Sequence, residues 1–204
     1  MPAPKLQTTI RNSRQRINKL IGYWSLSGCL EAKYQHFIAE MIMLRLFSIF
    51  EDSVAEIACK LASGAVYVNG CSPVLAAQSR SIAGARALFL SHGRADPVQN
   101  LKWTKSRYIR ESVQHVISTA DPFISSAQRN GNVINEMRKV RNALAHNTTS
   151  AKTDFRDVVR LTYGANVNIT PGAFLSSTRR TPVCNLDRYL LSTKALLVDM
   201  ACGI

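Results

Sequence analysis

Apolar residues recur every three or four positions along most of this chain, which is the spacing of one face of an α-helix. The longest run of this kind extends from Leu30 to Leu61, and Gly64 then provides a stop signal. Shorter runs predict helices over 5–20, 79–91, 106–118, 153–163 and 185–200. Two more are expected after Asp121-Pro122 and from Gly131 or Asn132 to His146. The pattern therefore predicts an all-α fold, a mainly helical bundle.

Turn-forming residues interrupt the helical pattern in two places. Between about 64 and 105 the chain carries Asn69-Gly70, Ser72-Pro73 and Asp96-Pro97, which predict a loop-rich insertion. Near 166–177, apolar residues flank Pro171-Gly172, a combination that suggests a small β-hairpin. We find no internal repeat, so residues 1–204 are expected to form a single helical domain.

The segment 131–146 has two unlike faces. At 100° per residue, one narrow stripe faces the core and consists of Val133, Met137, Val140 and Leu144. The opposite side carries Arg138, Asn142 and His146, with Arg141 at the boundary and small alanines between them. A basic, small-residue face on an anchored helix suggests a site or an interface. The competing interpretation is that Arg141 and His146 only cap the helix, where cations complement the free carbonyl groups.

Charge is the dominant property of the whole composition. The formal net charge is +13, which favours a polyanionic partner, nucleic acid before a membrane surface; charge alone fits a basic solvated surface without a partner equally well. Five scattered cysteines fit neither a disulfide framework nor a zinc site. No signal peptide is apparent, and the apolar run 41–50 is too short for a membrane span. We therefore expect a cytoplasmic protein with no membrane association.

Two further stretches are rich in cations. Residues 5–20 predict a basic amphipathic helix, and no acidic residue precedes Glu31. Between Arg80 and Arg110, seven Lys or Arg residues stand against a single acid, Asp96, with Trp103 and Tyr108 interleaved. Exposed aromatic rings among cations would stack on RNA bases. Burial of both rings is the more usual outcome.

The residue types around Arg141 suit cleavage of RNA. Arginine presents a planar fork of donors to a phosphate, histidine exchanges protons near neutral pH, and asparagine positions either of them. Together they could promote attack of a ribose 2′-hydroxyl on the adjacent phosphodiester, with arginine stabilising the developing charge. Because this reaction needs no metal-bound hydroxide, we expect neither a metal nor another cofactor.

The motif Arg141-Asn142-x-x-x-His146 near the end of a helix resembles that of the HEPN superfamily (higher eukaryotes and prokaryotes nucleotide-binding). The layout is most similar to stand-alone bacterial members that act as toxins or defence ribonucleases. The resemblance implies catalytic roles for Arg141, His146 and Asn142, and we add Arg138 and Lys139 as RNA-binding residues. Some members carry a modifiable tyrosine two residues after the histidine; this chain has Thr148 there.

The resemblance also implies a homodimer in which two copies of the 138–146 helix line one composite cleft. The expected function is therefore a metal-independent endoribonuclease with RNA as substrate, serving as a toxin or antiviral defence effector. An antitoxin or regulatory protein is a candidate partner. The alternative is a non-catalytic HEPN-like module that binds RNA, a nucleotide or a protein through the same face. A DNA-binding regulator is less favoured, since no compact helix-turn-helix is evident.

Overall fold

A computed structural model describes residues 4–203, so the first three residues and the last residue of the predicted 1–204 domain lie outside it. The described residues fold into helices and loops without a β-sheet, which confirms the all-α prediction. The helices are α1 (Leu6–Ser27), α2 (Ala32–Ala62), α3 (Ile82–Ser91), α4 (Ser106–Val113), α5 (Pro122–Arg129), α6 (Gly131–Ala145), α7 (Thr149–Tyr163), α8 (Pro171–Ser176) and α9 (Asn185–Cys202).

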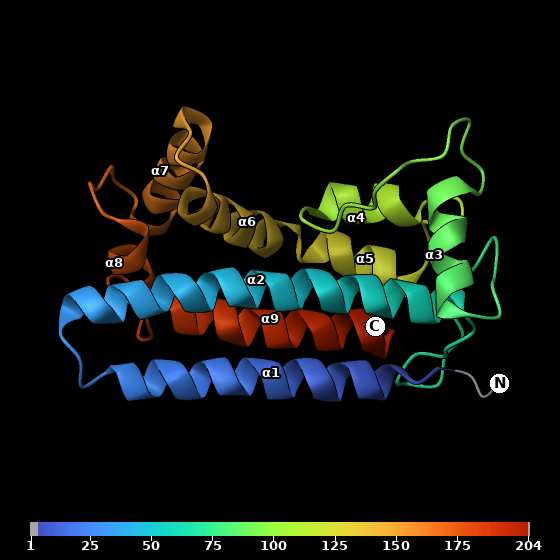
Figure 1. Ribbon diagram of the computed structural model, residues 1–204, viewed down its shortest axis with the longest axis horizontal. Helices are drawn as coiled ribbons and strands as arrows, with labels where there is room; N and C mark the ends of the chain where they lie inside the picture. The colour runs from blue at the N-terminus through green and yellow to red at the C-terminus, as the bar shows by residue number, and fades with distance from the viewer. Residues whose placement is uncertain (1–3, 204) are drawn as a thin grey trace.

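Three long helices form the base of the molecule. Helices α1, α2 and α9 contact one another along the long axis, with α1 antiparallel to both of the others (Figure 1). The middle of α2 is buried on most of its circumference and supplies large side chains such as Phe47 and Phe50 to the core. Helix α6 packs on α2, α5 packs on α9 and α4 packs on α5, while α7 and α8 lie at one end of the molecule and α3 at the other (Figure 1). No helix within residues 4–203 is long and apolar enough to cross a membrane.

The segment predicted as a loop-rich insertion, 64–105, consists of loops and α3. Its first part is tied to the bundle: Tyr67 donates its hydroxyl hydrogen to the buried carboxylate of Asp121, and the Val68 N–H donates to the Ala201 carbonyl (2.9 Å). A single β-bridge joins Leu75 to Ile117. Helix α4 ends at Val113 and not at the predicted residue 118, because Gln114 is non-helical and His115 has a positive φ (70°), which together turn the chain toward this bridge.

The predicted β-hairpin at 166–177 is wrong, because the segment contains α8. Thr170 caps this helix by accepting a hydrogen bond from the Ala173 N–H (3.3 Å), and Pro171 occupies its first position. The Gly172 N–H donates to Glu40 (3.0 Å) on α2. Proline followed by glycine fits a turn and a helix start equally well locally, and here packing against α2 favours the helix.

Candidate active site

Helix α6 is held by α2, α7 and α9 and has a fully buried face made of Ile134, Met137 and Val140. The buried face differs in part from the predicted core stripe. Met137 and Val140 are buried as expected, whereas Val133 and Leu144 are only half-buried and lie at the edges of the buried face. Because Val133 and Ile134 are adjacent in the sequence and both apolar, periodicity alone could not decide which of them faces the core.

Arg138 and Lys139, predicted to bind RNA, connect α6 to α7 in this structure. The Nη2 atom of Arg138 lies 3.4 Å from an Asp154 carboxylate oxygen and also donates to Asn135 Oδ1 (3.1 Å). Lys139 Nζ lies 3.7 Å from Asp154 and 3.6 Å from Asp157. Only 13% of the Arg138 side chain and 18% of the Lys139 side chain are exposed. A phosphate would have to compete with Asp154 for both cations.

Arg141 has different surroundings. Its guanidinium lies over the ring of Phe47, with Cζ 5.7 Å from the ring centroid, and its Nη1 donates to Asn142 Oδ1 (3.2 Å). Within residues 4–203, Arg141 forms no salt bridge with a carboxylate. The side chain is half-buried, so it retains access to solvent. Its unused donors are thus available to a ligand.

Glu51 on α2 belongs to the electrostatic environment of Arg141. Partial burial raises the pKa of the Glu51 carboxyl above its ordinary value, and the positive charge of Arg141 opposes this shift. Phe47 and Glu51 are four residues apart on α2 and therefore share one face of that helix. The site thus combines a cation from α6 with an aromatic ring and a carboxyl group from α2.

His146 follows the last residue of α6. Its backbone is extended (φ −135°, ψ 127°), its N–H donates to the Asn142 carbonyl (2.9 Å), and its side chain is exposed. Thr148, two residues later, caps α7 by accepting a hydrogen bond from the Ala151 N–H (3.2 Å). The imidazole therefore lies on a short exposed link between two helices, where solvent or a ligand can reach it.

The three predicted catalytic residues are connected in two different ways. Arg141 and Asn142 are joined through their side chains, while His146 is connected to Asn142 through its backbone N–H. Phe47 and Glu51 were not among the predicted site residues. The signal that could have indicated them is their four-residue spacing on α2, since that spacing places a ring and a carboxyl group side by side on one helix face.

The aromatic residues of the basic 80–110 stretch have separate environments. Trp103 is half-buried and packs edge-on against Phe89, with ring centroids 6.5 Å apart. Tyr108 lies close to two cations, since Lys102 Nζ is 5.5 Å and Lys105 Nζ 5.2 Å from its ring centroid. Trp103 is therefore a packing residue, and Tyr108 is the ring of this stretch that is associated with positive charge.

Comparison of the chain with protein-family models, with curated proteins and with solved structures gives no match in any of the three. The resemblance to the HEPN superfamily therefore rests on the motif Arg141, Asn142, His146 and on the order of the helices around it.

Proposed function

We propose that this protein is a metal-independent endoribonuclease, a toxin or antiviral defence effector that acts as a homodimer. Arg141 binds the scissile phosphate and stabilises its developing charge, Asn142 orients the guanidinium, and His146 transfers protons. The observation that carries the proposal is the state of Arg141. It is supported by Phe47 and Asn142 and forms no salt bridge within residues 4–203, although it interacts electrostatically with Glu51. The neighbouring cations Arg138 and Lys139, in contrast, are ion-paired.

The chemistry follows from these groups. Removal of a proton from the ribose 2′-hydroxyl lets its oxygen attack the adjacent phosphorus, and the bond to the 5′-oxygen of the next nucleotide then breaks as that oxygen gains a proton. Two proton transfers are needed. An exposed imidazole such as His146 serves for one, and the second comes from the His146 of the other copy. Arg141 stabilises the added negative charge on the phosphorane.

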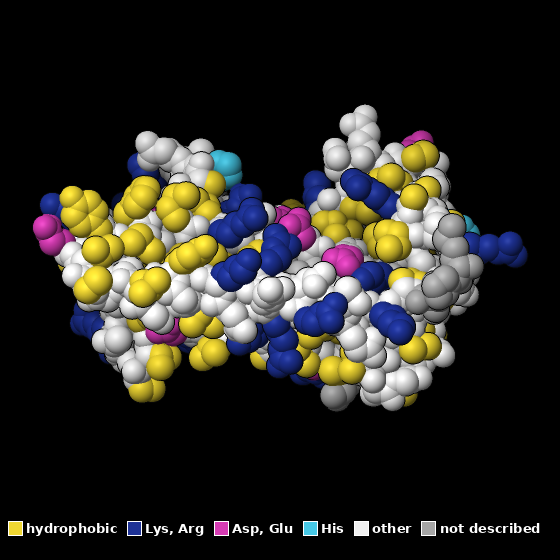
Figure 2. All heavy atoms as spheres, turned by 60° about the horizontal axis from the view of Figure 1, so that its bottom comes forward, with side chains coloured by type: hydrophobic (Ala, Val, Ile, Leu, Met, Phe, Trp, Pro, Cys, Tyr) yellow, Lys and Arg dark blue, Asp and Glu magenta, His cyan; other side chains and the backbone are white. Residues whose placement is uncertain are grey.

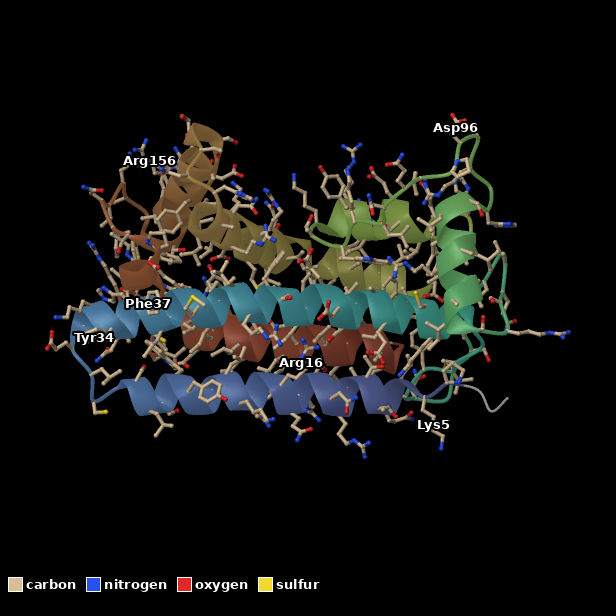
Figure 3. The ribbon with its side chains drawn as sticks, viewed as in Figure 1. Lys5, Arg16, Tyr34, Phe37, Asp96 and Arg156 are labelled. Carbon is tan, nitrogen blue, oxygen red and sulfur yellow. The ribbon has the colours of Figure 1, made fainter. Side chains whose placement is uncertain are left out.

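Exposed apolar side chains support the homodimer. They gather at the turn between α1 and α2 (Figure 2), where 61% of Tyr23, 74% of Leu26 and 61% of Phe37 is exposed. Figure 3 places Phe37 beside Tyr34 at this end of α2, the helix on which α6 packs. Clusters of large exposed apolar residues mark interaction surfaces in soluble proteins. A second copy covering this end would bury them next to the motif helix.

A dimer test follows from this surface. Phe37→Glu should convert a dimer into a monomer in analytical ultracentrifugation at micromolar concentration. Ile82→Glu is the matched control, because Ile82 is also exposed (46%) but lies on α3 at the other end of the bundle. A wild-type protein that sediments as a monomer would refute the dimer.

The alternative is a non-catalytic module that binds RNA, a nucleotide or a protein through the same face. One observation favours this alternative. His146 lies just beyond the C-terminal end of α6, and within one chain it is linked to Arg141 through hydrogen bonds of Asn142. Binding without turnover would fall steeply with salt, because each neutralised phosphate releases counterions.

The experiment that tests the proposal is incubation of purified protein with total cellular RNA, with and without a chelator. We expect cleavage that the chelator does not affect and that is lost in His146→Ala and in Arg141→Ala. Arg160→Ala is the matched control, since Arg160 is an exposed arginine that pairs with Asp157 on α7 and is not among the proposed site residues; it should retain most activity. Cleavage that survives both His146→Ala and Arg141→Ala would refute the site assignment. Binding without cleavage would establish the alternative.

A further inference from the structure

A groove runs between α1 and the C-terminal half of α9, with a free volume of about 920 Å³. The two helices are antiparallel (Figure 1), so the N-terminal part of α1 lies against the end of α9. Its α1 wall extends from Gln7 to Lys19, which is about three helical turns or roughly 18 Å. Neither Phe47, Arg141 nor His146 lines this groove, so it is separate from the candidate active site.

The rim of the groove is cationic. Arg11, Arg14 and Lys19 line it from α1, are all exposed, and form no salt bridge within residues 4–203. Arg16 provides the contrast: it lies between α1 and α2 and pairs with Asp52 at 3.2 Å (Figure 3). The part of the rim that the structure describes contains no carboxylate. The charge of these three cations is therefore not balanced inside the molecule.

The floor of the groove is apolar. It consists of Ile10 on α1, Val198 and Cys202 on α9, and Val68 from the loop after α2, of which 40% is exposed. Leu191, seven residues before Val198, lies on the same face of α9 and is 55% exposed. Lys194, between these two residues on the same face, donates through Nζ to Asn18 of the α1 wall (2.9 Å), so the apolar floor is confined to the end of the groove near Val198 and Cys202.

We propose that this groove binds an acidic amphipathic helix of a partner protein. A groove between two antiparallel helices can bind a third helix. The apolar side chains of that helix pack on the floor of the groove, and its flanking side chains contact the rim. Glutamate or aspartate on the side of the bound helix that faces α1 would match Arg11, Arg14 and Lys19, which all lie on that wall. The occupant is a helix and not a strand, because residues 4–203 present no sheet edge to which a strand could add.

Protein is favoured over the other polyanions by the floor. Single-stranded RNA would pair its phosphates with the rim but would need exposed rings on which to stack, and the groove is lined by aliphatic and polar side chains. A lipid surface is broad and flat, whereas these residues form a groove between two helices. An acidic helix satisfies rim and floor together. This inference does not depend on the proposed ribonuclease activity, because it concerns another surface and is tested by binding.

The test uses a fluorescein-labelled synthetic peptide of about 18 residues, long enough to cover the α1 wall as a helix. It carries leucine at positions i, i+4, i+7 and i+11 and glutamate on the flanking positions; a scrambled peptide of equal composition is the control. Fluorescence anisotropy with the full-length protein, at about 0.1 M salt, gives the dissociation constants. We expect the amphipathic peptide to bind at least about tenfold more tightly than the scrambled one.

Two sets of variants locate the binding. Arg11→Glu/Arg14→Glu should raise the dissociation constant of the amphipathic peptide at least about tenfold. Arg80→Glu/Arg86→Glu makes an equal change of charge at exposed positions outside the groove and should change that dissociation constant less than about twofold. Val198→Gln tests the floor without altering charge and should also weaken binding. Circular dichroism confirms that each variant is folded.

Equal affinity for the scrambled peptide, or equal loss in both charge variants, would overturn the proposal in favour of unspecific attraction. The same holds if Val198→Gln has no effect. If a single-stranded RNA oligonucleotide or phosphatidylserine vesicles bind more tightly than the peptide and lose binding in Arg11→Glu/Arg14→Glu alone, the groove takes that partner and the proposal is also overturned.

Discussion

The guanidinium of Arg141 lies 5.7 Å above the ring of Phe47, a residue that is completely buried in α2. The flat ring supports the flat cation from below and leaves its edge donors for Asn142 and for a ligand. A cation over an aromatic face gains about 0.5–2 kcal/mol, depending on its exposure to water. The orientation of the central residue of the candidate site thus depends on a side chain of another helix.

Replacing Phe47 with leucine should lower RNA cleavage beyond what lost packing explains. The change removes the ring beneath Arg141, and a loss of about 1 kcal/mol of support corresponds to a roughly fivefold lower kcat/KM. Phe50→Leu is the matched control, because Phe50 is equally buried and its ring centroid lies 5.6 Å from that of Phe47. Both variants should lose similar thermal stability, and only Phe47→Leu should lose activity. An equal loss of activity in both would contradict the role of the ring.

Glu51→Gln should alter the pH dependence of stability. The folded-state pKa of Glu51 is raised, so its stabilising contribution is present below the unfolded value of about 4.3 and is lost as pH rises through the folded value. Glutamine cannot ionise and avoids that loss. The Tm of Glu51→Gln minus that of wild type should therefore become more positive from pH 4 to pH 7. Glu31→Gln, at an exposed position, serves as the control; a difference that is constant with pH for Glu51→Gln would contradict the prediction.

Asp154→Asn should destabilise the protein more than Asp157→Asn. Asp154 meets Arg138 and Lys139 on α6, and both cations are largely buried, whereas Asp157 meets Lys139 at 3.6 Å and the exposed Arg160 on its own helix. Removal of the Asp154 charge leaves the largely buried Arg138 without its carboxylate and leaves Lys139 with Asp157 alone, which costs on the order of 1–3 kcal/mol. Urea unfolding measures both variants. Equal effects would show that the ion pairs of Asp154 do not hold α6 against α7.

Tyr67→Phe should weaken the attachment of the 64–78 loop to α5. The Tyr67 hydroxyl donates to Asp121 and accepts from the Phe123 N–H (3.2 Å), all within the buried interior. Its loss should cost about 1–2 kcal/mol in the free energy of unfolding. Tyr163→Phe is a matched control, because that buried hydroxyl accepts only a long hydrogen bond (3.4 Å) from Asn185 among the bonds that the structure describes. An equal loss in both variants would contradict the proposed anchor.

The sequence predicts most of the fold because long helices have apolar residues at a regular spacing of three or four positions. Eight of the described helices were expected near their observed positions, and Asp121, which accepts a hydrogen bond from the Phe123 N–H (2.9 Å), begins α5 as predicted. The helix at 171–176 was wrongly predicted as part of a β-hairpin because it is short. A six-residue helix carries too little periodicity to be recognised, and its formation depends on Glu40 and Phe155, which are distant in sequence.

The candidate site could be predicted only on its own helix. Arg141, Asn142 and His146 are close in sequence, so the motif was visible. The pairing of Arg138 and Lys139 with Asp154 depends on how α7 folds back on α6, and the support of Arg141 by Phe47 depends on how α6 crosses α2. Neither relationship leaves a signal in the periodicity of one segment. The contrast between Arg141, which forms no salt bridge within residues 4–203, and the paired Arg138 and Lys139 emerges only when three helices are placed together.

The central claim is that RNA is cleaved through its own 2′-hydroxyl at the site of Arg141 and His146. The most direct measurement uses a short RNA that the protein cleaves at one position, compared with the same RNA carrying a single 2′-deoxy sugar on the 5′ side of that bond. Mass spectrometry of the products should show a 2′,3′-cyclic phosphate, and the 2′-deoxy substrate should remain intact in the presence of a chelator. Cleavage of the 2′-deoxy substrate, or products with a 5′-phosphate that require magnesium, would contradict the account.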